Sequence, residues 1–294
     1  MRACEPGTSG FDQWNPDHYL EQYYGRVEAD EAATLDFITR ACRRVAVPGR
    51  ALVFGIGPTV HHMLPLAPHV RELHVADYLE SNLDHVRRWL KRDPLAHDWR
   101  PFARHVLCCE GVHAPTDQQV GAREALVRAR VTQCLRGDAG CESPMASVAL
   151  GSYDMVLSCY CAESATGDWY EWRRYLHNIV RLLAPGGLFI TAALRRCKAY
   201  CVGHRRFACA DIDEHDLAAV LQASGFAPAQ MHFEVQTVGL RERLGYDSIV
   251  LATARASPTG DRSGPPAARG ALPSQPRPQV LPSAGPARSK LPGS

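Results

Sequence analysis

The chain has 294 residues, of which 46% are hydrophobic and 22% charged, a composition typical of one large globular domain or of one domain with a tail. Its formal net charge of +2 is too small to indicate nucleic-acid binding. The sequence lacks the run of about 18 apolar residues that a membrane span needs and the apolar segment of a secretory signal, so we expect a cytoplasmic protein without membrane contact.

The first half of the chain alternates between helical and strand patterns. The segment 29–45 carries its apolar residues at helical spacing, which predicts an amphipathic helix. A short apolar run over 50–54 precedes a glycine, and a second strand over 73–76 precedes an aspartate. A helix over 82–91 follows, and the apolar run over 106–108 is interpreted as a third strand.

The alternation continues in the second half, except over 115–151, where no clear periodicity appears. A proline-glycine-glycine turn at 185–187 ends one helix, and Asp213 is expected to cap another. Alternation of this length predicts a doubly wound α/β fold with a mostly parallel sheet. The expected helices cover 169–183 and 213–224, and the expected strands cover 153–158, 188–192, 231–238 and 248–253.

The last part of the chain differs in composition. Residues 257–294 are mostly Pro, Gly, Ala, Ser and Arg, with almost no large apolar side chains. Such a segment cannot bury enough surface to offset its conformational entropy. The sequence therefore predicts one folded domain over 1–256 and a disordered tail over 257–294.

The eleven cysteines form no recognisable disulfide framework or metal-binding pattern. Their number is odd, and no two of them are spaced as Cys-x-x-Cys. Thiols stay reduced in the cytosol, and zinc ribbons and thioredoxin-type sites use closely paired cysteines. We therefore expect free thiols and no bound metal.

A glycine turn and an aspartate are spaced as in sites for an adenosine-type ligand. Gly55 and Gly57 follow the first strand, where the absence of a Cβ lets a ligand approach the backbone. Asp77 ends the second strand, and its carboxylate is expected to accept hydrogen bonds from ribose hydroxyls. The third glycine of dinucleotide sites is absent, and Pro58 has no N–H to offer a phosphate. The pattern therefore favours S-adenosyl-L-methionine, which has no phosphate, over NAD.

Several segments follow one another as they do in one methyltransferase family. The most specific is the opening Asn-Pro-x-x-Tyr-Leu-x-x-Tyr-Tyr over 15–24. Together these segments resemble the nicotinamide, phenylethanolamine and indolethylamine N-methyltransferases and thioether S-methyltransferase, over about residues 11–254. The resemblance implies a class I, Rossmann-like methyltransferase with an N-terminal helical cap, a monomer that methylates a nitrogen of a small amine, amino acid or pyridine. The other matching segments are 55–59, 77–82, 89–91, 98–99, 156–163, 183–188 and 200–203.

The resemblance also assigns roles to individual residues. It implies that Tyr19, as a catalytic residue, and Tyr24 close over cofactor and substrate, although helical spacing also allows both to be core residues. Asn82 would contact the cofactor, or simply begin a helix. The implied cofactor-binding residues are Tyr19, Tyr24, Gly55, Gly57, Thr59, His61, Asp77, Tyr78, Asn82, Val131 and Cys159, and the implied substrate-binding residues are Tyr160, Glu163, Arg196 and Tyr200.

Three positions depart from the family pattern. Val53 replaces an acidic residue often found in the first strand, and His61 falls where the family often has a tyrosine. Arg130, just before Val131, stands where the family commonly has an aspartate near the adenine amine. Adenine recognition at this position is therefore an open question.

Glu163 is the candidate catalytic carboxylate. In methyl transfer, positive charge moves from the sulfonium sulfur towards the acceptor, so a carboxylate near the acceptor stabilises the transition state. Glu163 follows the fourth predicted strand, and phenylethanolamine N-methyltransferase has an amine-facing glutamate at the matching place. The alternative is an acidic residue that compensates a helix dipole.

Arginines follow the fifth predicted strand, where the family's amine enzymes often have an acidic group. Arg196 at this place would repel a bare cationic amine and bind a carboxylate. The hypothesis is a substrate that carries an anionic group beside its methyl acceptor, and the alternative is that the arginine is simply solvated.

Other functions remain open at the level of sequence. A methyltransferase of the same fold that acts on sulfur, oxygen or arsenic fits the cysteines near Cys159 and Cys197. A methyltransferase-like binding protein without catalysis fits the departures at Val53 and Arg130. A nicotinamide-dependent dehydrogenase is disfavoured by the missing third glycine.

Overall fold

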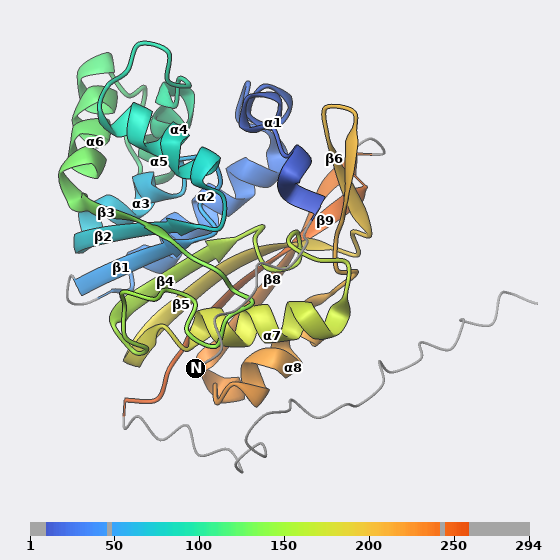
Figure 1. Ribbon diagram of the computed structural model, residues 1–294. Coiled ribbons are helices and arrows are strands. Elements are labelled where there is room, and N and C mark those ends of the chain that lie inside the picture. The colour runs from blue at the N-terminus through green and yellow to red at the C-terminus, as the bar shows by residue number, and fades with distance from the viewer. Residues whose placement is uncertain (1–9, 46–48, 242–244, 259–294) are drawn as a thin grey trace, which may run out of the picture. The chain divides into compact units, whose positions relative to one another are not determined.

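The strands of the main sheet come from both halves of the chain. The computed structural model describes residues 10–45, 49–241 and 245–258 (Figure 1). The predicted tail over 257–294 lies outside the described residues from 259 onward. The strands of the main sheet are β1 (Gly49–Phe54), β2 (Val70–Asp77), β3 (Val131–Arg136), β4 (Tyr153–Cys159), β5 (Leu183–Arg195), β8 (Met231–Arg241) and β9 (Tyr246–Arg255).

The strand order of this sheet is β3-β2-β1-β4-β5-β9-β8. Strands β1 to β5 are parallel to their neighbours, whereas β9 is antiparallel to both β5 and β8. In the register, Val53 lies opposite Val75 on one side and Leu157 on the other. The order reverses between β1 and β4, which is where open α/β sheets bind their ligands. The predicted doubly wound, mostly parallel sheet is confirmed.

Helices cover both faces of the sheet. Helices α2 to α6 lie on one side and α7 and α8 on the other (Figure 1), each set over its own cluster of buried apolar side chains. Burial on both faces explains why the central strands are almost continuously apolar. The helices are α1 (Pro16–Tyr23), α2 (Ala29–Cys42), α3 (Met63–Leu66), α4 (Glu80–Leu90), α5 (Arg100–Cys109), α6 (Asp117–Arg130), α7 (Trp169–Val180) and α8 (Glu214–Ala223).

The predicted third strand over 106–108 is wrong, because these residues belong to helix α5. Pro101 lies in the first turn of α5, and Phe102, Ala103, Val106 and Leu107 bury one face at helical spacing. The third strand is instead β3, which follows α6 inside the segment whose pattern was unclear. Three helices, α4, α5 and α6, therefore connect β2 to β3.

The predicted start of α8 agrees with the structure. The predicted helix over 169–183 is too long, because α7 ends at Val180, and the Pro-Gly-Gly segment at 185–187 lies within β5 rather than in a turn. The Asp213 side chain accepts hydrogen bonds from His215 N and Asp216 N, and so caps α8 as expected. Asn15 caps α1 by accepting a hydrogen bond from His18 N. Among the described helices, none combines the length and apolar character of a membrane span.

The N-terminal cap contacts a small hairpin made of β6 (Ala199–Val202) and β7 (Arg205–Ala208). The Tyr23 hydroxyl donates to the Cys201 carbonyl at 2.7 Å, and the ring of Phe11 stacks on that of Phe207. These contacts join residues nearly 200 positions apart above the carboxyl edge of the sheet. The predicted helical cap is confirmed, and the hairpin is its partner.

Candidate active site

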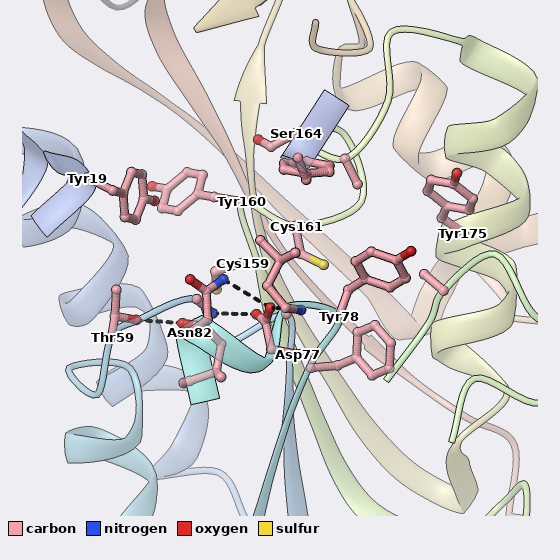
Figure 2. Close-up of a pocket in the computed structure, with 18 of the residues that line it drawn as sticks. Tyr19, Thr59, Asp77, Tyr78, Asn82, Cys159, Tyr160, Cys161, Ser164 and Tyr175 are labelled. Atoms are coloured by element: carbon pink, nitrogen blue, oxygen red, sulfur yellow. Dashed lines mark hydrogen bonds between the residues drawn. The ribbon is translucent and has the colours of Figure 1, made fainter. Parts of the chain in front are cut away.

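A cavity of about 370 Å³ lies at the carboxyl ends of β1 and β4, where the strand order reverses. Figure 2 shows Asp77 between two groups of side chains. Tyr19 and Tyr160 lie on one side, which we call the α2 end, because the beginning of α2 also lines it. Tyr78 and Tyr175 lie on the other side, which we call the α7 end.

The glycine loop after β1 is held by backbone hydrogen bonds. Gly55 N and Ile56 N both donate to the Ala76 carbonyl, and Gly57 N donates to the Asp77 carboxylate at 2.7 Å. Pro58 has no N–H. These amides are engaged inside the protein, so the loop does not form the ring of free N–H groups that cradles a phosphate. This arrangement suits a cofactor without phosphates.

Gly55 is required at its position for two reasons. Its φ of +70° lies in the left-handed region, and a Cβ there would come within 2.1 Å of Cys161 Sγ. The close approach brings the loop after β4 against the loop after β1. Gly55 therefore shapes the floor of the cavity.

Asp77 is the most buried acidic group in the centre of the cavity. Its carboxylate accepts hydrogen bonds from Gly57 N, from Leu79 N at 2.9 Å and from Asn82 Nδ2 at 3.0 Å. Burial raises the pKa of Asp77, and the hydrogen bonds from the protein oppose that rise. Oδ1 accepts two of these hydrogen bonds and Oδ2 accepts one, so Oδ2 keeps acceptor capacity for a ribose hydroxyl. Trp14 Nε1 donates to Asn82 Oδ1 and fixes the amide's orientation.

The α7 end holds a carboxylate that the sequence interpretation missed. Strand β3 ends at Arg136, and Asp138 in the loop that follows lines the cavity. Its carboxylate accepts hydrogen bonds from Gly140 N and Cys141 Sγ, which hold the side chain in place. The signal was present in the sequence, because an acidic residue shortly after a parallel strand is also the pattern of Asp77.

The expectation for Arg130 and Val131 is corrected by this placement. Val131 begins β3, at the end of the strand remote from the carboxyl edge, and Arg130 ends α6. Neither is among the described residues that line the cavity. The acidic group at this end is Asp138, so Arg130 does not argue against adenosine binding.

Tyrosine side chains dominate the α2 end. The Tyr19 and Tyr24 hydroxyls are 3.2 Å apart, and the Tyr160 hydroxyl is 2.6 Å from Thr34 Oγ1 of α2. Tyr246 of β9 donates to the Asp30 carboxylate. Tyr160 has a φ of +52°, a strained conformation for a bulky residue. This backbone conformation directs the Tyr160 ring away from the end of β4 and into the α2 end of the cavity.

A glutamate and two histidines form a buried cluster at the same end. His61 Nε2 and His62 Nε2 lie 2.9 Å and 3.3 Å from the same oxygen of Glu31, and Tyr24 donates to the other oxygen. Burial lowers the pKa of His61 to about 4. Burial alone would raise the pKa of Glu31, but the two histidines hold it below its usual range. The cluster therefore presents a carboxylate beside a neutral imidazole at neutral pH.

Glu163 lies behind the cavity wall. Its carboxylate accepts a hydrogen bond from Leu194 N at 3.1 Å, and Leu194 lines the cavity, whereas Glu163 is not among the described lining residues. Burial raises the pKa of Glu163 to about 7. The Glu163 side chain is thus near the cavity where the methyl acceptor is expected, but a backbone segment separates it from that cavity.

Arg196 also lies away from the cavity. Its guanidinium pairs with the carboxylates of Asp211 and Asp213, and it is not among the described lining residues. Arg195 likewise pairs with Glu214. The acidic cap of α8 draws these arginines towards itself, so the structure gives the hypothesis of an arginine-bound anionic substrate no support.

The structure brings most of the predicted site residues together at one cavity. Like Val131, Glu163 and Arg196, the predicted residue His61 does not line the cavity. It lies behind Tyr24 and His62 and has no exposed surface. The predicted residues that line the cavity are Tyr19, Tyr24, Gly55, Gly57, Thr59, Asp77, Tyr78, Asn82, Cys159, Tyr160 and Tyr200.

Comparison with known proteins gives a consistent match. The NNMT/PNMT/TEMT family matches residues 5–255. Nicotinamide N-methyltransferase of Homo sapiens is 29% identical over 220 residues, which cover 72% of this chain and 82% of the relative. Phenylethanolamine N-methyltransferase of Sus scrofa is 29% identical over 259 residues, which cover 83% and 89%.

A solved structure supports the fold. The CurJ carbon methyltransferase superposes with a TM-score of 0.51 at 12% sequence identity, covering 84% of this chain and 62% of that one. At this identity the likeness concerns the arrangement of strands and helices. It agrees with the α/β fold described above.

Proposed function

We propose that this chain methylates a nitrogen base held at the α2 end of the cavity. The premise is that it belongs to the NNMT/PNMT/TEMT family of S-adenosylmethionine-dependent N-methyltransferases. The observation that carries the proposal is the position of Asp77, which ends β2 beside the point where the strand order reverses. On one side of it is a glycine loop without free phosphate-binding amides, and on the other is the tyrosine-lined α2 end. A methyl donor in the centre would then face its acceptor at the α2 end.

The residues around the centre fit S-adenosylmethionine. Asp77 would accept the ribose hydroxyls, and Asp138 would accept the adenine amine at the α7 end. Tyr78 and Tyr175 line the same end and offer ring faces to the base. The cofactor supplies an electrophilic methyl group on a sulfonium. The protein holds donor and acceptor in line, and such positioning can lower a barrier by roughly 7–11 kcal/mol.

The α2 end favours a substrate that is uncharged or that binds as a cation and loses its proton before it accepts the methyl group. Asp30 and Glu31 line it, and Arg174, the sole arginine or lysine among the described lining residues, belongs to α7. A carboxylate on the substrate would find no guanidinium or ammonium partner at this end. We therefore infer an amine or pyridine-type substrate rather than an amino acid.

Tyr19 and Glu163 have different roles in this proposal. Tyr19 lines the cavity beneath Trp14, so it contacts the reactants and shields them from water. Burial raises the pKa of Tyr19, so it stays a neutral phenol that can donate a hydrogen bond. Glu163 is a positioning residue, since it fixes Leu194 at the wall through its backbone N–H.

Two measurements test the proposal. Calorimetry should show binding of S-adenosylhomocysteine and no binding of NAD. A methyl-transfer screen with isotopically labelled S-adenosylmethionine should then label small amines or pyridines. Labelling confined to thioethers, hydroxyl compounds or arsenite would assign a different acceptor atom, and NAD binding without S-adenosylhomocysteine binding would refute the cofactor site.

A further inference from the structure

The cluster of Glu31, His61 and His62 has the composition of a metal site. One potential ligand atom from each residue lies within 4.8 Å of the other two, and all three residues are buried. One carboxylate and two imidazoles form the protein ligand set of several catalytic zinc centres, which leave a further position open. The sequence did not predict this site, because Glu31 lies thirty positions before His61.

The donor atoms converge on one point. Both histidine Nε2 atoms approach the same carboxylate oxygen, at 2.9 Å and 3.3 Å, and the two imidazole rings are 3.9 Å apart at their centroids. In a tetrahedral site with zinc–ligand bonds of 2.0–2.2 Å, neighbouring ligand atoms are roughly 3.3 Å apart. The observed separations are close to this value, so a small ion can be accepted with modest side-chain movement.

The surrounding side chains hold the cluster in place. The ring of Trp99 lies parallel to that of His61 at 5.1 Å, and Phe102 and Tyr24 close two further sides. Tyr24 also hydrogen-bonds Glu31, as residues around metal ligands commonly do. An apolar shell with one oriented carboxylate keeps the donor atoms together at little entropic cost.

The cluster opens towards the cavity. Glu31 and His62 line it, whereas His61 forms the rear of the cluster. Asp30 adds a second carboxyl group to the same end. The free coordination position of an ion bound to the cluster would point into the cavity.

We propose that Glu31, His61 and His62 bind a divalent transition-metal ion, zinc or one of similar preference, whose open position takes water or a hydroxyl oxygen of a small molecule at the α2 end. Imidazole and carboxylate ligands suit these ions better than calcium or magnesium. The inference concerns the cluster itself and does not depend on which substrate is methylated.

Cobalt titration of the full-length protein tests the proposal. After treatment with EDTA, wild-type protein should bind one Co²⁺ per chain, with visible d–d absorption and without the near-ultraviolet band of cobalt thiolates. His62→Gln should weaken binding by at least about tenfold, the effect expected for a lost ligand contact. His232→Gln is the matched control, because His232 contacts Glu234 at 2.9 Å in a pair outside the cluster.

Three results would overturn the proposal. They are absence of Co²⁺ and Zn²⁺ binding by the folded wild type, a thiolate band that assigns the ion to cysteines, and equal affinity in wild type and His62→Gln. If His62→Gln does not fold, Glu31→Gln replaces it. The spectrum of the wild-type complex then still distinguishes nitrogen and oxygen ligands from sulfur.

Discussion

The two ends of the cavity are built in different ways. The centre and the α7 end take Gly57, Asp77 and Asp138 from the carboxyl ends of β1, β2 and β3 and from the loops that follow them. The α2 end combines side chains from α1, α2, β9 and the end of β4, so that Tyr19 and Tyr246 line one compartment. The first arrangement follows from the topology of the sheet, and the second from packing of distant segments.

The difference shows which site residues can be located from the strand order alone. The carboxyl ends of parallel strands always meet at one edge, so residues after β1 and β2 form a site in any protein with this strand order. The α2 end has no such constraint, and neighbouring residues there can face different ways. His62 lines the cavity while His61 does not, although they are adjacent in the chain.

The largest expected effect concerns Glu163 and the free energy of unfolding. Its pKa of about 7 in the folded protein exceeds the value of about 4.3 in an unfolded chain. The folded state therefore binds more protons between these values, and stability falls as pH rises through the window, by roughly 4 kcal/mol in total. Glu163→Gln should remove this decline, as measured by urea unfolding at pH 5 and pH 8.

A control variant shows whether the change in pH dependence is specific to Glu163. Glu142→Gln changes an acid in the loop between β3 and β4, and should leave the pH dependence of wild type in place. If Glu163→Gln and wild type lose the same stability between pH 5 and pH 8, the carboxyl group is not buried as the structure places it.

The next effect concerns the centre of the cavity. Asp77→Ala should weaken S-adenosylhomocysteine binding by roughly 1.5–3 kcal/mol, the range for hydrogen bonds to charged groups. Calorimetry measures this difference directly. Asp84→Ala, which removes an exposed carboxylate on α4, should bind as wild type does. Unchanged affinity in Asp77→Ala would remove the basis for the cofactor site.

A smaller effect is expected at the α7 end. If Asp138 accepts the adenine amine, wild type should prefer S-adenosylhomocysteine over S-inosylhomocysteine, which has an oxo group in place of that amine. Asp138→Ala should reduce this preference by about 0.5–1.5 kcal/mol. Arg130→Ala is the control at the position first associated with adenine, and it should keep the preference. The opposite pattern would restore Arg130 to the site.

The smallest effect is expected for Arg196. Because its guanidinium pairs with Asp213 and Asp211 outside the cavity, Arg196→Ala should leave the KM of an accepted substrate unchanged. Its side chain is 39% exposed, so the loss in stability should stay within about 1 kcal/mol. The test compares acid and amide forms of one substrate. A selective rise in the KM of the acid form would revive the anionic-substrate hypothesis.

The class of fold and the position of the central site residues follow from local patterns in the sequence. Apolar strands that alternate with helices, followed by a glycine turn or Asp77, require only local patterns and the edge rule of parallel sheets. The opening motif likewise identified Tyr19 and Tyr24, which line the cavity. The fold class was predictable, and these residues could be located at the cavity, because each inference depends on residues close together in the chain.

Other features of the site depend on contacts between distant parts of the chain. Residues 106–108 are apolar enough for a strand, but burial against α2 and α6 selects the helical spacing of α5. The partner of Arg196 depends on where α8 begins, and Asp138 was assigned only once β3 was placed at the edge of the sheet. Glu31 and the histidines meet because two distant segments pack together. Such contacts depend on long-range packing, which no local pattern in the sequence encodes.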